Sequence, residues 1–331
     1  MRYLRMARLA WMCLLAFAAV GCARLGDADR EAGLLTDFGV EVDGESRIYD
    51  IYLPDGDWDD PPRALVILLH GNRSSKEDLN GTSFATSPYS LWQPLADSEN
   101  FALLIPQGSD GPEGDRGWND CRADASGNPT TNDVAFLVAA AQEVAEDRNI
   151  DLEKVFAVGT SNGGHMAQRL ADEAPSLVRG IGVIAAGVTA NSACASSNEP
   201  VAALFMWGTA DPIAPFAGGQ MASDRGEILS ADASIARWVE RNGLAGTPTE
   251  TNFPDLEDGD DSTVVRASYR TENRAPVDLY RVVGGGHTEP SISEQYRRLF
   301  ERVVGRQNHD IEMAEEVWAF FEDTLDDVQQ S

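Results

Sequence analysis

Hydrophobic residues in this chain gather in short unbroken runs, and segments with helical periodicity lie between them. The run Ala64–His70 (ALVILLH) is apolar at odd and even positions alike, which is typical of a strand covered on both faces of a sheet. From Thr131-Asn132-Asp133 onward, apolar residues recur every three or four positions, which predicts a capped helix. On these criteria we expect strands at 64–70, 101–105, 155–159, 181–186, 201–207 and 277–283, and helices at 133–147, 162–173, 227–242 and 311–325. This alternation predicts an α/β fold: a mostly parallel, doubly wound sheet with helices on both faces, in a single domain.

Two stretches depart from this alternation. Residues 47–66 have the pattern of strands interrupted by a Pro- and Asp-rich turn. The segment 246–275 is polar and acidic, and we expect loops with an edge strand there. A long polar segment of this kind is either a lid or a surface connection, and we favour the surface connection.

The chain opens with basic residues followed by an apolar run from Leu9 to Val20. This run is short for a membrane-spanning helix, and the basic-then-apolar order is typical of a secretory signal. The segment Ala19-Val20-Gly21-Cys22 resembles the lipobox of bacterial lipoproteins, in which the cysteine is acylated and becomes the first residue. Secretion without a lipid stays open, because Ala19 stands where leucine is commoner.

These features divide the chain into a signal peptide (1–21), a polar tether (22–36) and a folded domain (37–327). We expect the domain to lie outside the cytoplasm, anchored to the bacterial cell envelope through a lipid on Cys22 or secreted. Ala23, rather than aspartate, after that cysteine favours the outer membrane if the source is Gram-negative.

Charge restricts the partners. The chain has 54 acidic and 26 basic residues and a net charge of −28, which argues against binding to nucleic acid or to an anionic membrane surface. A lipid anchor is therefore the only membrane contact that we expect. We interpret the acidic residues themselves as a solvated surface without a role in catalysis.

The four cysteines fall into two groups. Cys13 lies in the predicted signal peptide and Cys22 is the predicted lipidation site, which leaves Cys121 and Cys194. An even number in an oxidising compartment, each just past a predicted strand at the same edge of the sheet, predicts a disulfide between them; two buried free thiols are the alternative. The chain has no CxxC and no His/Cys cluster at zinc spacing, so we expect no metal site.

Ser161 is the candidate nucleophile. It lies in Gly159-Thr160-Ser161-Asn162-Gly163, between a predicted strand and a predicted helix. In such a strand–turn–helix junction the serine hydroxyl is exposed at the carboxyl end of the sheet, and the glycines allow the sharp turn and close helix packing. The pattern is weak alone, but this context makes it informative.

A serine needs a base, and the base needs a third group to fix its tautomer. Asp211 follows the predicted strand 201–207, and His287 follows the predicted strand 277–283. Their order, at strand ends after Ser161, predicts the triad Ser161–Asp211–His287. His309 is the other histidine after Asp211, and we interpret it as a surface residue or a helix cap.

Two backbone amides are the expected donors to a developing oxyanion. The central strand ends in His70-Gly71-Asn72, which places the Asn72 amide beside the substrate carbonyl, and the Asn162 amide begins the helix after Ser161. We interpret His70 as a support for this loop and His165 as a packing residue.

Six blocks of the sequence, in order, carry a specific resemblance to a known family. They are LLHGNRSS, GWNDC, VFAVGTSNGGHMAQRLADEAP, WGTADPIAP, GGGHTEP and GRQNHDIEMAEEVWAFF, within residues 36–325. They resemble secreted polyhydroxybutyrate-depolymerase-like esterases, a group similar to the feruloyl and acetylxylan esterases of carbohydrate esterase family 1. The resemblance implies an α/β-hydrolase fold, hydrolysis of carboxylic esters and no cofactor. It also implies that Ser161 is the nucleophile, Asp211 the acid and His287 the base.

The sequence departs from this family in the expected substrate cleft. Glu289 stands where the family often has tryptophan two residues past the catalytic histidine, and its carboxylate is expected to repel anionic substrates. Trp118, in the GWND block, is a candidate for the cleft wall or a packing anchor. We expect the substrate to be a feruloyl or acetyl ester of a polysaccharide, or a hydroxyalkanoate oligomer.

Two other functions fit the sequence less well. A serine peptidase of the same fold is disfavoured because the chain has no room for an added propeller domain and its motifs match esterases. A non-catalytic surface protein on a hydrolase scaffold is disfavoured because a binding module has no need of the serine, the aspartate and the histidine together.

We predict that Cys22→Ala releases the protein from the membrane. Three acyl chains hold a protein firmly, because each buried CH₂ contributes about 0.8 kcal/mol. Fractionation of cells that express the wild type or the variant measures this directly. Equal amounts of both proteins in the soluble fraction would contradict lipidation at Cys22.

Overall fold

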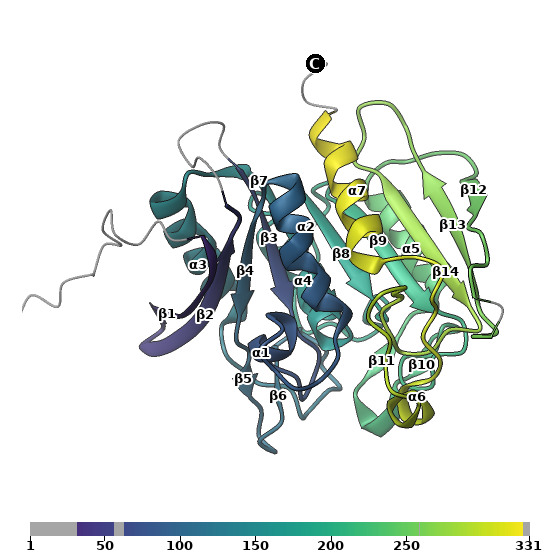
Figure 1. Cartoon of the computed structure of the whole chain (residues 1–331), viewed down its shortest axis with the longest axis horizontal. Helices are drawn as coiled ribbons and strands as arrows, with labels where there is room; N and C mark the ends of the chain where they lie inside the picture. Colours follow the sequence, from purple (N-terminus) through teal and green to yellow (C-terminus); the bar gives the residue numbers. More distant parts are fainter. Residues whose placement is uncertain (1–31, 56–62, 258, 327–331) are drawn as a thin grey trace, which may run out of the picture. The chain divides into compact units, whose positions relative to one another are not determined.

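A ten-stranded β-sheet runs through the computed structural model, which describes residues 32–55, 63–257 and 259–326 (Figure 1). Its middle is parallel, as the alternation of strands and helices predicts. In spatial order these parallel strands are β4 (Ala102–Pro106), β3 (Arg63–Leu69), β7 (Ile150–Thr160), β8 (Gly180–Ile184), β9 (Ala202–Gly208) and β14 (Val277–Val283). They are buried along almost their whole length, because helices cover both faces.

Antiparallel strands complete the sheet on both sides. The hairpin of β1 (Gly33–Val42) and β2 (Glu45–Leu53) pairs with β4. On the other side, β13 (Thr263–Tyr269) pairs with β14, and β12 (Thr249–Asn252) forms the edge. The parallel strands, which carry the candidate site, thus lie away from both edges of the sheet.

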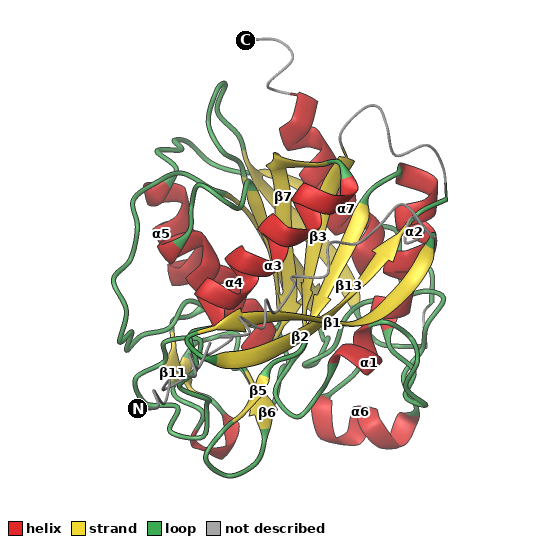
Figure 2. Cartoon of the chain, turned by 90° about the vertical axis from the view of Figure 1, so that its left-hand side faces the viewer, coloured by secondary structure: helices red, strands yellow, loops and turns green. Residues whose placement is uncertain are grey.

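Helices form a layer on each side of the sheet, which Figure 2 shows close to edge-on. One layer holds α3 (Asp133–Arg148), α4 (Asn162–Glu173) and α5 (Ala231–Arg241), and the other holds α2 (Trp92–Glu99) and α7 (Met313–Asp326). An apolar core lies between the sheet and each layer.

Shorter elements gather at the carboxyl ends of the parallel strands, along the lower edge of the molecule in Figure 1. They are α1 (Lys76–Leu79), β5 (Ser109–Asp110), β6 (Arg116–Gly117), β10 (Gly219–Gln220), β11 (Glu227–Ile228) and α6 (Arg298–Val304). The 3-10 turns η1 (Pro88–Leu91) and η2 (Ala222–Asp224) complete the connections. Binding sites of doubly wound folds lie at this edge of the sheet.

Most predicted elements are present, and three predictions need correction. The predicted helix 227–242 begins only at Ala231, because Glu227 and Ile228 pair with β10 as a short strand. The segment 246–275 contributes two edge strands rather than one. Strand β1 begins at Gly33, inside the predicted tether.

The predicted signal peptide and Cys22 lie outside the described residues. Within the described ranges, no helix has the length and apolar content needed to cross a membrane.

A disulfide joins Cys121 to Cys194, as the even number of cysteines in the folded domain predicts. Their Cα atoms are 5.6 Å apart. It connects the loop after β6 to the loop after β8. Two backbone hydrogen bonds lie beside the disulfide. The amide of Ala193 donates to the carbonyl of Cys121 (2.8 Å), and the amide of Ala123 donates to the carbonyl of Asn191 (2.8 Å). The two loops are therefore one unit on the face that α4 covers.

We predict that replacing Cys121 and Cys194 together by alanine lowers the free energy of unfolding by about 2–4 kcal/mol, because the unfolded chain regains the freedom of a long loop. Urea unfolding of the oxidised wild type and the double variant measures the difference. Reduced wild type is the control and should match the variant. Equal stability, with both thiols of the unreduced wild type open to alkylation, would contradict the bridge.

Candidate active site

Ser161 is the single residue between the end of β7 and the start of α4. Its backbone has a conformation that residues with a side chain rarely adopt. Its φ is 56° and its ψ is −118°. Two backbone bonds hold it there: its amide donates to the carbonyl of Ile184 (2.8 Å), and its carbonyl accepts from the amide of His165 (3.0 Å). The strain thus places the serine side chain at the carboxyl edge of the sheet, between β3 and β8.

Glycines make this turn possible. A Cβ on Gly159 would lie 2.4 Å from the carbonyl carbon of Gly163, and a Cβ on Gly163 would lie 2.1 Å from the carbonyl oxygen of Leu69. Both separations are far below van der Waals contact. Helix α4 can therefore begin directly against β3 and β7 only because both positions lack a side chain.

Asp211 and His287, which follow the neighbouring strands β9 and β14, are hydrogen-bonded to each other. The Nδ1 atom of His287 lies 2.7 Å from Oδ2 of Asp211. The other oxygen, Oδ1, accepts the amides of Ile213 and Ala214, each at 2.8 Å. Since both carboxylate oxygens are acceptors, Nδ1 carries the hydrogen of this bond, and Nε2 is the ring nitrogen that the carboxylate does not contact.

The structure joins Asp211 to His287 but does not join His287 to Ser161. Within the described part of the chain, the Ser161 hydroxyl forms no hydrogen bond with His287. Catalytic hydrogen bonds in ligand-free sites are often long and tighten only when substrate binds.

The loop His70–Asn72 lies against Ser161. A Cβ on Gly71 would lie 3.5 Å from the carbonyl oxygen of Thr160 and 3.8 Å from Cβ of Ser161, so the backbone of this loop runs beside the serine. The backbone of Gly71 is therefore a close neighbour of the Ser161 side chain.

His70 fixes this loop with both ring nitrogens. Its Nε2 accepts the amide of Gly108 (2.9 Å), so Nδ1 carries the hydrogen and donates to the carbonyl of Gly71 (2.8 Å). Burial is the main reason that the pKa of His70 falls to about 4. The ring is neutral and has a supporting role, as expected.

Asn162 connects the start of α4 to the neighbouring loop. Its side chain accepts the amide of Trp118 (2.7 Å), and its Nδ2 donates to the carbonyl of Trp118 (3.0 Å) and to Oδ2 of Asp120 (2.6 Å). Arg122 pairs with Asp120 at 2.7 Å. Burial opposes ionisation of Asp120, but Arg122 and the hydrogen bonds outweigh it and lower the pKa of Asp120.

Asp120 and Arg122 were missed from the sequence. Asp120 lies in the GWNDC block and Arg122 follows it directly. Opposite charges beside a tryptophan and a cysteine are as consistent with a buried ion pair as with a surface one, and this was the signal in the sequence. The buried pair anchors the side chain of the residue that follows Ser161.

Both candidates for the substrate cleft are buried: Trp118 takes the second of its two expected roles, and the expectation for Glu289 needs correction. Trp118 is completely buried, because its indole N–H donates to the carbonyl of His70 (2.8 Å) and its ring packs against that imidazole. It is a packing anchor and forms no wall of a cleft. Glu289 is also buried, and its Oε2 accepts the hydroxyl of Tyr296 (2.5 Å). Its carboxylate thus has a partner within the protein and does not form the open anionic wall that we expected.

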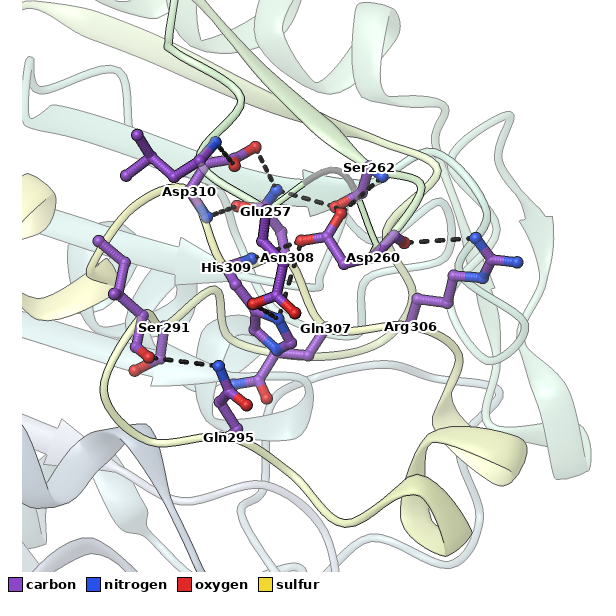
Figure 3. A network of polar contacts seen from close by, with 12 residues as sticks. Glu257, Asp260, Ser262, Ser291, Gln295, Arg306, Gln307, Asn308, His309 and Asp310 are labelled. Atoms are coloured by element: carbon purple, nitrogen blue, oxygen red, sulfur yellow. Dashed lines mark hydrogen bonds and ion pairs between the residues drawn. The ribbon is translucent and has the colours of Figure 1, made fainter.

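The polar network drawn in Figure 3 adjoins the loop of His287, because Arg306 and Asn308 of this network accept the backbone amides of Gly286 and Ser291. The amide of His287 donates to the carbonyl of Val304 (2.6 Å). The chain that follows α6 is tied to residues 255–262, because Asp260 accepts the amide of His309 (2.8 Å) and Ser262 accepts Nδ2 of Asn308 (2.8 Å). Part of the acidic segment 246–275 therefore braces the histidine loop.

His309 itself is not the surface residue that we expected. Only 12% of its side chain is exposed, and its Nδ1 lies 3.2 Å from a carboxylate oxygen of Glu257. It lies within the network of Figure 3.

One group of side chains has metal-ligand spacing among the described residues, namely Cys121, Glu173 and Cys194. Both cysteines are consumed by the disulfide, so neither can offer the thiolate that a metal would bind. In this oxidised form the group is no metal site.

Comparison with known proteins gives consistent results. A family model described as "Esterase PHB depolymerase" matches residues 47–218. NocK of Nocardia uniformis subsp. tsuyamanensis, assigned as an esterase, is 28% identical over 290 residues, which is 81% of this chain and 78% of that protein. Feruloyl esterase D of Neurospora crassa is 28% identical over 226 residues, covering 67% of this chain and 72% of the relative.

Among solved structures, the acetyl xylan esterase from Aspergillus awamori superposes with a TM-score of 0.50 at 14% sequence identity. The match covers 73% of this chain and 89% of that one. At this identity the likeness establishes the fold.

We predict that His70 makes stability depend on pH. The pKa of the imidazole is 6.5 in the unfolded chain and about 4 in the folded protein. Between these pH values the unfolded state binds more protons, so the free energy of unfolding falls as the pH falls, by up to about 3 kcal/mol from this residue.

Urea unfolding at a series of pH values, for the wild type and His70→Gln, isolates this contribution because His165 and the carboxylates titrate in both proteins. The difference in stability between the two should be constant above pH 6.5 and shrink as the pH falls towards 4. Two parallel curves would contradict a neutral, buried His70.

Proposed function

The chain belongs to the esterase PHB depolymerase family, has an α/β-hydrolase fold and is an esterase, and on that premise we propose that Ser161, His287 and Asp211 hydrolyse its ester substrate through an acyl-enzyme. The observation that carries the proposal is the hydrogen bond between Asp211 and His287, at the same sheet edge as a serine in a strained turn. Each of the three residues follows a different parallel strand, which is how this fold assembles a triad.

The proposed reaction has two halves. In the first, Oγ of Ser161 attacks the ester carbonyl carbon while Nε2 of His287 takes the hydroxyl proton, and the imidazolium then gives that proton to the departing alcohol. In the second, His287 takes a proton from water, the resulting hydroxide attacks the acyl carbon, and the carboxylic acid leaves as Ser161 regains its proton. Asp211 holds the ring and stabilises its protonated form throughout.

The backbone amides of Asn72 and Asn162 are the proposed oxyanion donors. Two features support them: the Asn72 loop runs beside Ser161, and the Asn162 amide is the first of α4, where it has no partner within the helix. One such donor typically contributes about 3 kcal/mol to transition-state stabilisation. Because the Asn162 side chain is bonded to Trp118 and Asp120, the amide is held in place before substrate arrives.

The proposed substrates are feruloyl or acetyl esters of a polysaccharide, or hydroxyalkanoate oligomers. The names of the relatives and of the matched fold support this range. We also propose that the protein works outside the cytoplasm, bound to the cell envelope by a lipid on Cys22, and the disulfide fits an oxidising compartment. Rates on methyl ferulate, acetylxylan and hydroxybutyrate oligomers, measured side by side, rank the three substrate classes.

We predict that Ser161→Ala lowers kcat/KM on p-nitrophenyl acetate by roughly three to six orders of magnitude while the fold is kept. His287→Ala should cost about as much, and the double variant little more, because the two residues act as one unit. Asp211→Asn should lose about 10⁴-fold, because the amide favours the wrong imidazole tautomer.

Ser98→Ala, at an exposed position on α2, is the matched control and should keep wild-type activity. Circular dichroism and urea unfolding report the folding of every variant. A folded Ser161→Ala protein with most of its activity would rule out the proposed mechanism.

A further inference from the structure

Helix α6 turns apolar side chains outward. It is seven residues long and lies on the outside of the molecule, at the carboxyl edge of the sheet (Figure 1 and Figure 2). Leu299 is 74% exposed and Val303, one turn later, is 69% exposed, whereas Val304 is buried. A surface helix normally packs its apolar stripe against the core, so an apolar stripe in solvent indicates a contact surface.

Arginines flank this stripe. Arg298 and Arg302 are also one turn apart on α6, directly beside Leu299 and Val303, and Arg297 precedes the helix. All three arginines are exposed, and none of them forms an ion pair within the described ranges of the chain. Their charges are therefore available to a partner.

The basic character of this segment is local. Residues 297–306 hold four arginines and one acidic residue, Glu301, in a chain that has 26 basic residues in 331. Oε1 of Glu301 accepts the amide of the buried Gln307 (3.1 Å), and Arg306 pairs with Asp261. The outer side of α6 thus combines exposed apolar side chains with an excess of positive charge.

We propose that α6 docks the domain onto an anionic lipid surface. Leu299 and Val303 enter the boundary between headgroups and acyl chains, and the three arginines pair with lipid phosphates. This is how amphipathic helices with basic and apolar side chains bind a membrane interface. Phe300, which is 48% exposed, adds to the apolar surface.

Two other occupants fit this surface less well. A second copy of the chain brings the same arginines face to face across a two-fold axis, where like charges repel. An uncharged polymer contacts the apolar side chains but leaves the arginines without a partner. An anionic lipid surface uses both kinds of side chain.

The net charge of −28, from which we expected no attraction to an anionic surface, does not prevent this contact. It is a sum over the whole chain, and in physiological salt exposed charges more than about 8 Å from the lipid are largely screened. Because α6 lies on the outside of the molecule, its own arginines decide the local interaction.

Docking through α6 also orients the edge of the sheet that carries the proposed triad. The carbonyl of Val304 accepts the amide of His287 (2.6 Å), and the carbonyl of Arg306 accepts the amide of Gly286 (2.8 Å). The helix and the His287 loop are thus tied together, and a membrane that holds α6 faces this edge. The proposal goes beyond the proposed ester hydrolysis and does not depend on it.

Fluorescence quenching in vesicles tests the contact. The purified protein carries a dye on Val303→Cys and is reconstituted in phosphatidylcholine vesicles that contain phosphatidylglycerol and a spin-labelled lipid as quencher. The matched control carries the dye on Thr247→Cys, an exposed position before β12, at the amino ends of the parallel strands. We expect strong quenching at position 303 and little at position 247. In vesicles of phosphatidylcholine and quencher alone, both positions should be quenched little.

Charge variants separate α6 from the rest of the chain. Arg298→Gln with Arg302→Gln should lower the ratio of docked to undocked protein about 25-fold, because each arginine near an anionic surface contributes about fivefold. Arg237→Gln with Arg274→Gln removes the same charge at exposed positions elsewhere and should leave the quenching unchanged. Circular dichroism reports the folding of both double variants.

Equal quenching at positions 303 and 247, equal quenching in neutral vesicles, or equal effects of the two arginine pairs would overturn the proposal. So would a dimer in detergent that Leu299→Ser dissolves, measured by light scattering, because a second copy would then cover α6. None of these readouts uses ester hydrolysis. An inactive triad variant that docks, or an active enzyme that does not, therefore tells failure of one proposal from failure of the other.

Discussion

The rest of the site depends on one strained residue, because the backbone of Ser161 is held at a φ of 56°. That conformation has an energetic cost of order 1–3 kcal/mol and persists only where the surroundings enforce it. Here the enforcement comes from three strands: β7 leads into the turn, the end of β8 accepts the serine amide, and β3 packs against Gly163. A side chain at Gly159 or Gly163 would push α4 away and release the turn.

Loops that follow different strands contact one another around this turn through hydrogen bonds, ring packing and the disulfide. His70 ties the loop after β3 to Gly108 after β4, and Trp118 packs on that imidazole. Asn162 then bonds to Trp118 and Asp120, and the disulfide continues the chain of contacts to the loop after β8. On the other side, the network of Figure 3 holds the loop of His287. The residues around Ser161 and His287 are thus held in place by the loops next to them, and groups fixed in this way are preorganised.

The sequence was informative wherever local pattern decides the outcome. Helix 162–173 and strand 277–283 have the bounds that periodicity predicted, and Asp211 and His287 meet because both follow parallel strands. Predictions failed where contacts outside the local periodicity decide. Residues 227–228 form a strand because they pair with β10 across a turn, and Glu289 is buried because it pairs with Tyr296 across a loop. Trp118, whose role was left open between cleft wall and packing anchor, is decided by His70, 48 residues away.

The most direct test of the central claim is to trap the covalent intermediate. Wild-type protein and Ser161→Ala are mixed with p-nitrophenyl acetate, quenched in acid within the first turnovers, digested and examined by peptide mass spectrometry. If the strained serine is the nucleophile, the peptide that contains Ser161 carries an acetyl group in the wild type, and no peptide of the variant is acetylated to a comparable extent. Acetylation of another residue, with the Ser161 peptide unmodified while product is released, would contradict it.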